Sequence, residues 1–249
     1  MRINVLQLTD IHLFAAPTQS LKGINTEQSF VAVLEAIALV GRKPDLVVLT
    51  GDLTQLGEAA AYQRLVEHCK QFTCPIYALP GNHDDFTVQQ QVFTNSAISS
   101  EKSFLKHNWH FIALNSVIPG YNEGALSQSE LNFLQTALTR YAKLPTVIML
   151  HHHVQKVNGD MDTMMLTNAE DFLRVIKPFK NVRLVLCGHV HQAFDQTIDS
   201  IRYLTSPSTC LQIKVGATEF VADEKAKPGY RWLELNEDGT IETKVVRIK

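Results

Sequence analysis

The chain has 249 residues, of which 45% are hydrophobic and 19% charged, and its formal net charge is −2. This length suits one large α/β domain or two small ones, and the lack of a Pro/Ser-rich linker or an internal repeat favours a single domain over residues 1–249. The near-neutral charge and the lack of a Lys/Arg run argue against a nucleic-acid partner. No apolar run approaches the roughly 18 residues that span a bilayer, and no signal-peptide pattern opens the sequence. We therefore expect a cytoplasmic protein without a membrane partner, and the oligomeric state is left open.

The four cysteines, Cys69, Cys74, Cys187 and Cys210, form no C-x-x-C pair and are too few for a disulfide framework in a chain of this length. We expect reduced, mostly buried thiols. Cys187 adjoins a group of polar residues but continues an apolar run, so we assign it to the core rather than to a set of metal ligands.

Five apolar runs rich in β-branched residues predict buried strands, and each is followed closely by residues that can bind a metal ion. The runs cover residues 3–8, 46–50, 76–79, 147–150 and 184–187. The polar groups that follow them are Asp10-Ile11-His12, Gly51-Asp52, Gly81-Asn82-His83-Asp84, His151-His152-His153 and Gly188-His189-Val190-His191. In a mostly parallel α/β sheet the strand ends converge on one edge, so these groups can meet in one crevice.

The segments between these strands carry helix and loop signals. Apolar spacing predicts helices near residues 30–38, 62–72, 86–93, 131–138 and 168–176, with Asn25 and Ser127 as N-caps. Residues 109–114 predict a further strand, and residues 154–167 lose periodicity and predict a loop that forms a wall for the substrate. Short strands at residues 201–205, 211–215, 230–235 and 240–248 suit an antiparallel half packed against the first sheet.

Seven side chains are candidate metal ligands: Asp10, His12, Asp52, Asn82, His151, His189 and His191. Seven are too many for one ion and suit two ions that share a bridging carboxylate, for which Asp52 is the natural candidate. The members of the pairs Asp10/His12 and His189/His191 are two residues apart, so locally extended backbone would point both side chains of a pair the same way. Four imidazoles without thiolates favour Mn, Fe, Zn, Co or Ni over Ca or Mg.

A count of charges at this site predicts the substrate class. Two divalent cations bring four positive charges, whereas Asp10, Asp52 and a bridging hydroxide bring three negative ones. The net positive centre favours an anion that gains negative charge in the transition state, as a phosphate ester does during in-line attack.

Several polar residues near the strand ends have two possible roles. His83 either shapes the Gly81-Asn82 turn or contacts the phosphate and donates a proton to the leaving oxygen, and we favour the second role. Asn168 reads first as an N-cap, and Asp84 and Asp85 read as the start of a helix. We expect surface or capping roles for His68, His107 and His110. The methionines Met161, Met164 and Met165 either line an adenine pocket or fill gaps beneath a loop.

The order D-x-H, G-D, G-N-H-D, H and G-H-x-H resembles the signature of the calcineurin-like metallophosphoesterases, and every signature position is filled. This resemblance implies an α/β fold with four α-β-β-α layers, in which two mixed sheets are flanked by helices. It also implies one metal site formed by Asp10, His12, Asp52 and His191 and a second formed by Asp52, Asn82, His151 and His189. The first histidine after a strand is the usual ligand in this family, which leaves His152 and His153 to supporting or structural roles.

The sequence is also similar to the bacterial class III 3′,5′-cyclic AMP phosphodiesterases over almost its whole length, including the segments 8–14, 79–84, 186–192, 207–210 and 228–231. This similarity implies a phosphodiesterase in which a hydroxide bridging two ions, with Fe or Mn preferred and Zn, Co or Ni possible, attacks the phosphorus of cyclic AMP to give 5′-AMP. It further implies phosphate contacts from His12, Asp52, Asn82, His83 and His191, with His83 and Asp52 as the catalytic residues. The alternatives are a phosphodiesterase for other cyclic nucleotides or glycerophosphodiesters and, less favoured, a non-catalytic metal-binding scaffold.

Overall fold

The first apolar run of the sequence forms a strand in the middle of one sheet. The protein is described by a computed structural model covering residues 2–248, and within that range this sheet has six strands in the order β14-β13-β1-β4-β5-β6. Their bounds are Arg2–Leu8 (β1), Leu46–Thr50 (β4), Ile76–Leu79 (β5), Ile98–Ser99 (β6), Gly229–Asn236 (β13) and Ile241–Arg247 (β14). Because β1, β4 and β5 are parallel neighbours, the polar groups after them, with Asp10, Asp52 and Asn82, meet at one edge of the sheet.

The second sheet brings the remaining candidate ligands to the same end of the molecule. Among residues 2–248 it also has six strands, in the order β11-β12-β10-β9-β8-β7. Their bounds are Ser103–Lys106 (β7), Trp109–Ala113 (β8), Thr146–Met149 (β9), Val182–Cys187 (β10), Phe194–Ile198 (β11) and Ile201–Thr205 (β12). His151 follows β9, and His189 and His191 follow its parallel neighbour β10.

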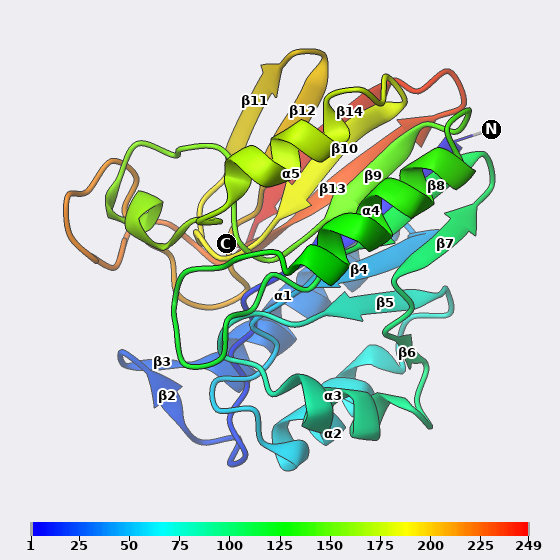
Figure 1. The fold of residues 1–249 in the computed structure, drawn as a ribbon. Coiled ribbons are helices and arrows are strands. Elements are labelled where there is room, and N and C mark those ends of the chain that lie inside the picture. The colour runs from blue at the N-terminus through cyan, green and yellow to red at the C-terminus, as the bar shows by residue number, and fades with distance from the viewer. Residues whose placement is uncertain (1, 249) are drawn as a thin grey trace.

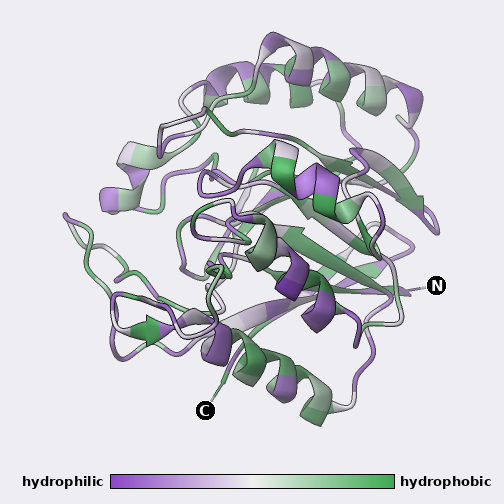
Figure 2. Ribbon diagram, turned by 90° about the horizontal axis from the view of Figure 1, so that it is seen from below, coloured by the Kyte–Doolittle hydropathy of each residue, from purple (hydrophilic) through white to green (hydrophobic). Residues whose placement is uncertain are grey.

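Helices cover the outer face of each sheet (Figure 1). Helices α1, α2 and α3 share an apolar cluster with the first sheet, whereas α4 and α5 share another with the second. The helix bounds are Thr26–Val40 (α1), Ala59–Cys69 (α2), Phe86–Phe93 (α3), Gln128–Arg140 (α4) and Ala169–Ile176 (α5). In Figure 2 the helices alternate between hydrophobic and hydrophilic stretches along their length, as expected for helices with one face on a core. None of the helices between residues 2 and 248 is long and apolar enough to cross a bilayer.

Alternation along the strands builds the four layers. In β1, Leu6 and Leu8 belong to the cluster under the helices, whereas Ile3 and Val5 belong to a third cluster that contains residues of both sheets. Successive strand side chains point to opposite faces, so one face of the sheet meets helices and the other meets the second sheet. The predicted four-layer α/β fold is therefore confirmed.

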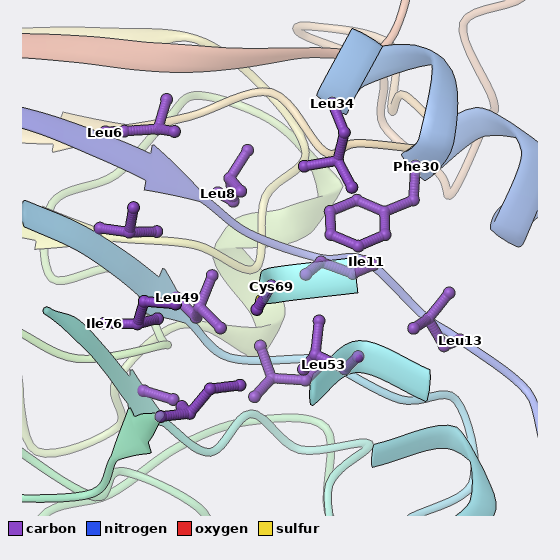
Figure 3. Packing of buried hydrophobic residues seen from close by; sticks show 14 of the residues in the cluster. Leu6, Leu8, Ile11, Leu13, Phe30, Leu34, Leu49, Leu53, Cys69 and Ile76 are labelled. Carbon is purple, nitrogen blue, oxygen red and sulfur yellow. The ribbon is translucent and has the colours of Figure 1, made fainter. Parts of the chain in front are cut away.

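The core also orients the polar residues that follow β1. Ile11 and Leu13 are fully buried in the same cluster as Phe30 of α1, as Figure 3 shows. Because these two apolar side chains point into the core, Asp10 and His12 beside them are left for the opposite side. Helix α1 is fixed in turn by the side chain of Asn25, which accepts a hydrogen bond from the backbone N–H of Gln28, as the predicted N-cap requires.

Two predictions about the fold are wrong. The C-terminal strands do not form a separate half, because β13 pairs antiparallel with β1 in the first sheet and β12 pairs parallel with β10 in the second. Residues 211–215 form no strand and make only an isolated bridge between Ile213 and Ala222. A small hairpin of Ser20–Leu21 (β2) and Ile24–Asn25 (β3), which the sequence did not predict, precedes α1.

The histidines outside the polar groups follow the prediction only in part. His107 is exposed and His68 is half-buried beside Glu27, in agreement with a surface role. His110 instead lies inside β8, is fully buried, and its Nε2 is 2.9 Å from the Ser103 hydroxyl. Burial lowers its pKa to about 4, so a neutral imidazole fills this core position.

Candidate metal centre

The seven candidate ligands lie together where the two sheets end. We call Asp10, His12, Asp52, Asn82, His151, His189 and His191 the polar cluster. Within it, His12 Nε2 is 3.2 Å from His191 Nε2, and His151 Nε2 is 3.2 Å from Asn82 Oδ1 and 3.3 Å from Asp52 Oδ2. Six of the seven side chains are buried and Asn82 is half-buried. Residues separated by up to 181 positions in the sequence thus face one small volume.

The backbone reaches this geometry in a way that the sequence did not predict. Asp10, His12, Asp52, His189 and His191 have positive φ angles between 50° and 70°. The expected locally extended backbone is therefore wrong, because left-handed residues turn the chain at each of these positions. Such φ values are uncommon for residues other than glycine and cost of order 1 kcal/mol or more each, and they persist where surrounding contacts enforce them.

Backbone hydrogen bonds between the loops supply that enforcement. The N–H groups of Asp10 and His12 donate to the carbonyls of Gly51 and Asp52 at 3.0 and 2.9 Å. The N–H of His189 donates to the Asp10 carboxylate, 3.1 Å from each of its oxygens. The loops after β1, β4 and β10 therefore hold one another.

Glycine is required at two positions because neighbouring loops approach closely. A Cβ at Gly51, whose φ is +92°, would lie 2.4 Å from Nδ1 of His151. A Cβ at Gly81 would lie 2.2 Å from Oδ1 of Asp52. Larger residues would push apart the groups that meet here, which explains the Gly-Asp and Gly-Asn pairs.

Asp52 lies between the two halves of the polar cluster. Its Oδ2 is 3.7 Å from His12 Nε2 and 3.3 Å from His151 Nε2, and its Oδ1 accepts the N–H of His83 at 2.9 Å. Asp10 lies on the His12 side, with Oδ1 3.4 Å from His191 Nε2. One carboxylate therefore faces histidines from both sheets.

Two histidines are fixed with Nε2 directed into the cluster. His151 Nδ1 donates to the Thr50 carbonyl at 2.8 Å, and His191 Nδ1 donates to the Leu211 carbonyl at 2.7 Å. A carbonyl can only accept, so each Nδ1 carries a hydrogen and each neutral ring presents a lone pair at Nε2. Histidine ligands of metal ions are usually oriented by a hydrogen bond of this kind.

Burial and the carboxylates act in opposite directions on the histidines of the polar cluster. Burial acts to lower the pKa of His151, but the Asp52 carboxylate outweighs it and raises this pKa to about 9. Burial likewise opposes the fall in the pKa of Asp52, which His151 and His12 nevertheless hold well below its ordinary value. Burial lowers the pKa of His12 to about 3 and holds that of His189 well below its ordinary value. His12 and His189 are therefore held neutral, whereas Asp52 favours a proton on His151.

These residues fit a pair of metal ions on two observations. Ligand atoms that are about 2.1 Å from one ion lie roughly 3.0–3.5 Å from one another, close to the 3.2–3.4 Å spacings of the Nε2 and oxygen atoms here. In addition, His189 Nε2 is buried and has no hydrogen-bond partner among residues 2–248. A buried nitrogen without a partner is costly unless an ion or a water binds it.

His83 lies beside the cluster but belongs to a different set of contacts. Its ring centroid is 5.0 Å from that of His12. Its Nδ1 is 3.1 Å from the Gln55 carbonyl and 2.9 Å from the Gln55 side-chain amide. The Gln55 carbonyl can only accept a hydrogen bond, so Nδ1 of His83 carries the hydrogen. If the Gln55 side-chain amide is rotated by 180°, which exchanges its oxygen and nitrogen, its oxygen accepts from the same N–H. Nε2 of His83 is then the nitrogen left for the cleft.

Asp84 joins two loops, a role that was not predicted from the sequence. Asp85, not Asp84, caps α3, by accepting the N–H groups of Thr87 and Val88. The carboxylate of Asp84 accepts hydrogen bonds from a different set of donors, namely the N–H groups of Leu53, Thr54 and Gly81 and the hydroxyls of Thr54 and Tyr62. It joins the loop after β4 to the loop after β5. No local pattern distinguishes this role from a helix cap.

The structure distinguishes the three consecutive histidines. His152 Nε2 donates to the Asn122 carbonyl at 3.2 Å, and its Nδ1 lies 2.8 Å from the Ser116 hydroxyl, so both ring nitrogens have protein partners. The Nε2 of His153 is 3.5 Å from Asp162. His151 is the member of the triplet whose Nε2 faces Asp52 and Asn82.

The predictions for Asn168 and for the loop at residues 154–167 have different outcomes. The Asn168 side chain makes no capping hydrogen bond; its amide bonds instead to the backbone N–H and carbonyl of Leu126, both at 2.9 Å. The predicted loop at residues 154–167 contains a short 3₁₀ helix at Asp160–Met164 (η1). Met161 and Met164 line a cleft of about 270 Å³ together with His12, Asp52 and Asn82. Met165 does not line it.

Comparison with known proteins agrees with this geometry. The family described as calcineurin-like phosphoesterase matches residues 3–193. The 3′,5′-cyclic adenosine monophosphate phosphodiesterase CpdA of Escherichia coli is 39% identical over 249 residues, which cover 99% of this chain and 90% of that protein. The 3′,5′-cyclic-nucleotide phosphodiesterase alr5338 of Nostoc sp. is 38% identical over 247 residues, covering 99% and 92%.

Solved structures add a likeness of fold. A dimetal phosphatase from Danio rerio has a TM-score of 0.67 at 14% identity, with 99% of each chain covered. GAP50 of Plasmodium, described as the anchor in the inner membrane complex, has a TM-score of 0.71 at 16% identity, covering all of this chain and 85% of that one. The low identities to these structures support the fold alone, whereas the family match and the near full-length relatives support membership of the family. The chain belongs to the calcineurin-like phosphoesterase family, and its relatives CpdA and alr5338 are named 3′,5′-cyclic-nucleotide phosphodiesterases.

Proposed function

We propose that this protein is a dinuclear metal-dependent phosphodiesterase that hydrolyses 3′,5′-cyclic AMP to 5′-AMP. The observation that carries the proposal is the polar cluster, in which imidazole nitrogens and carboxylate oxygens face one volume at ligand-like spacing. The 39% identity to CpdA over almost the whole chain supports the choice of substrate.

Two ions would be held by two sets of residues that share Asp52. One set is Asp10, His12, Asp52 and His191, and the other is Asp52, Asn82, His151 and His189. The ligands are oxygen and imidazole nitrogen without thiolate, which suits Fe or Mn and also admits Zn, Co or Ni. Bound ions would activate a water for in-line attack on phosphorus and would neutralise charge on the phosphoryl oxygens.

The protein's own groups would bind and orient the phosphate. We assign phosphate contacts to His12, Asp52, Asn82, His83 and His191, of which Asp52 acts through the ions because a carboxylate repels the phosphate. Hydrolysis consumes one water, breaks the bond between phosphorus and O3′, and leaves O3′ needing a proton. We assign this role to the imidazolium form of His83, whose Nδ1–H is bound by Gln55 and whose Nε2–H faces the cleft and can donate its proton to O3′.

A broader phosphodiesterase is the second candidate. It is favoured by the name of the Nostoc relative, which specifies cyclic nucleotides rather than cyclic AMP. The fold alone does not exclude a scaffold, since GAP50 shares it. The complete polar cluster speaks against a scaffold, because a protein without catalysis has no need to keep buried histidines beside carboxylates.

The test combines metal content with a substrate panel. The purified protein is analysed for metals, stripped with a chelator, and reloaded with Fe, Mn, Zn, Co or Ni one at a time. Each form is then assayed on cyclic AMP, cyclic GMP, a 2′,3′-cyclic nucleotide and bis(4-nitrophenyl) phosphate. We expect about two ions per chain and 5′-AMP as the product from cyclic AMP. Cleavage of the aryl diester without cleavage of cyclic AMP would refute the substrate, and bound metal without hydrolysis of any of the four substrates would favour the scaffold.

A further inference from the structure

The cleft beside the polar cluster has a second side of opposite character. Its volume is about 270 Å³, near the lower end for small-molecule sites, so it suits one small ligand rather than a polymer. Besides members of the polar cluster, the lining includes a group that we call the apolar wall: Leu21, Lys22, Met161, Met164, Ile213 and Phe220. Five of these six residues are apolar. A phosphate needs no such surface.

The apolar wall rests on a small core of its own. Val157, Met161, Val190 and Ile213 form a buried cluster distinct from the three large ones, with Met164 packed against it. Val190 is the residue between His189 and His191, and it is fully buried. The same short segment therefore presents imidazoles to the polar cluster and an apolar side chain to the base of the wall. This fixes the wall relative to the metal centre.

Contacts between three loops complete the wall. The Lys22 ammonium, at the tip of the β2–β3 hairpin, lies over the Phe220 ring, 4.8 Å from its centroid. The N–H of Asp160 in η1 donates to the Ala217 carbonyl at 2.8 Å. Figure 1 shows the η1 loop and the loop after β12 projecting together from the same end of the molecule. The wall is thus assembled from segments near residues 22, 160 and 220.

The wall offers few hydrogen-bonding groups. Three amide side chains line the cleft, namely Gln55, Asn82 and Asn122. Gln55 is bound to His83, and Asn82 lies against His151. Within residues 2–248 the Asn122 side chain makes no hydrogen bond, but the residue is exposed, so water competes for its amide. A ligand on this wall is therefore held mainly by apolar contact.

We propose that the apolar wall binds the nucleobase of the cyclic nucleotide, mainly through Met164 and Phe220, and that it selects a planar base without distinguishing strongly between purines. This inference rests on the proposed phosphodiesterase function. The base is attached to C1′, on the far side of the ribose from the cyclic phosphate, so a phosphate at the polar cluster directs the base across the cleft. Stacking and dispersion are available to every base, whereas discrimination requires hydrogen bonds to the base edge.

The same chemistry separates a nucleotide from a glycerophosphodiester. A glycerol group has no planar face and would leave Met164 and the exposed Phe220 in contact with water. A purine would cover them, and the thioether of methionine makes favourable contacts with aromatic rings. The wall thus favours a cyclic nucleotide over a glycerophosphodiester as the substrate.

The experiment uses two substrates that differ only in the base. Cyclic AMP is compared with methyl β-D-ribofuranoside 3′,5′-cyclic phosphate, which keeps the same cyclic phosphate, on the metal-loaded full chain. We divide kcat/KM for cyclic AMP by kcat/KM for the methyl riboside. Phe220→Ala and Met164→Ala should each lower this ratio by roughly 5- to 100-fold, mainly by raising KM for cyclic AMP. Leu39→Ala removes another exposed hydrophobic residue, at the end of α1 away from the cleft, and should leave the ratio as in the wild type.

The outcomes separate this inference from the function on which it rests. If the wild type fails to hydrolyse cyclic AMP, the proposed function is wrong. If the wild type hydrolyses it and both wall variants keep the wild-type ratio, the base lies elsewhere and the inference is wrong. Cyclic GMP tests the weak discrimination: we expect kcat/KM within roughly tenfold of that for cyclic AMP, and a difference above about 100-fold would overturn the stacking account.

Discussion

The two sides of the cleft are built in opposite ways. The polar cluster follows strand ends of both sheets, and its loops are held by mutual hydrogen bonds and by close contacts that only glycine permits. The apolar wall comes from three loops that meet through side-chain packing, one cation–π contact and a single backbone hydrogen bond. Chemistry that tolerates little displacement is thus placed on the rigid framework, and recognition of the variable part of the substrate is placed on loops.

This division predicts that the largest losses come from the polar cluster. Asp52→Asn keeps the size of the side chain but removes the charge that faces histidines from both sheets. We expect kcat/KM for cyclic AMP to fall by about 1000-fold or more, since several kcal/mol of stabilisation depend on ions held at this position. Metal analysis should show fewer than two ions per chain.

A control on the surface separates loss of the site from loss of charge. Asp171 is a half-buried residue of α5 outside the cleft and pairs with the exposed Arg174, so Asp171→Asn should change activity by less than about twofold. If Asp52→Asn retained both its metals and its rate, Asp52 would not be the shared ligand.

His83 tests whether a residue beside the cluster can matter without holding metal. His83→Asn should keep the metal content and lower kcat by roughly 100-fold or more, the usual range for loss of general acid catalysis. His107→Asn is the matched control, because His107 is exposed on the turn between β7 and β8. A fall in metal content together with rate would instead assign His83 to the ligands.

Gly51 tests the close packing behind the cluster. Gly51→Ala would place a methyl group 2.4 Å from Nδ1 of His151 and must displace that ring. We expect a loss of about 100-fold in kcat/KM, because misplacement by about 1 Å can cost that much. Gly120 also has a positive φ, +82°, but a Cβ there would meet nothing within 4 Å.

The pair of glycine variants therefore separates backbone strain from steric clash. Gly120→Ala should cost only about 1 kcal/mol in the free energy of unfolding and leave activity within about twofold. Equal losses of activity in both variants would mean that backbone strain, and not contact with His151, explains the glycine at position 51.

The sequence predicted the polar side better than the apolar one, for a physical reason. Strand ends and ligand types are local features, so the polar cluster and the layers could be read from runs of apolar residues and the polar groups after them. The left-handed backbone at Asp10 and His189 could not be predicted from the sequence, because it depends on hydrogen bonds between loops that are distant in sequence. Which of the three consecutive histidines faces the cluster likewise depends on distant residues. Ser116 and Asn122 contact both ring nitrogens of His152, and His151 is the one that faces Asp52.

The errors outside the cluster have the same origin. Residues 211–215 alternate like a strand, yet Ile213 satisfies its burial by packing on Met161 and Val190 instead of in a sheet. His110 is polar in type, yet a buried hydrogen bond to Ser103 allows it to fill a core position. An apolar pattern shows that a residue will be buried, but not against what.

The smallest expected effect concerns Gln55, which connects the two sides. Its backbone carbonyl and its side-chain amide both contact His83 Nδ1. Gln55→Leu removes only the amide, so the backbone contact still orients the ring, and kcat should fall by about tenfold with little change in KM. Gln63→Leu, on the exposed face of α2, is the matched control.

A double-mutant cycle determines whether Gln55 acts through His83. Once His83 is asparagine there is no imidazole to orient, so adding Gln55→Leu should cost less than about twofold further in kcat. If instead the two losses multiply, Gln55 contacts the substrate directly. The amide would then belong with Asn122 among the groups able to read the base edge, and the discrimination between cyclic AMP and cyclic GMP should change in Gln55→Leu, which gives the same variants a second readout.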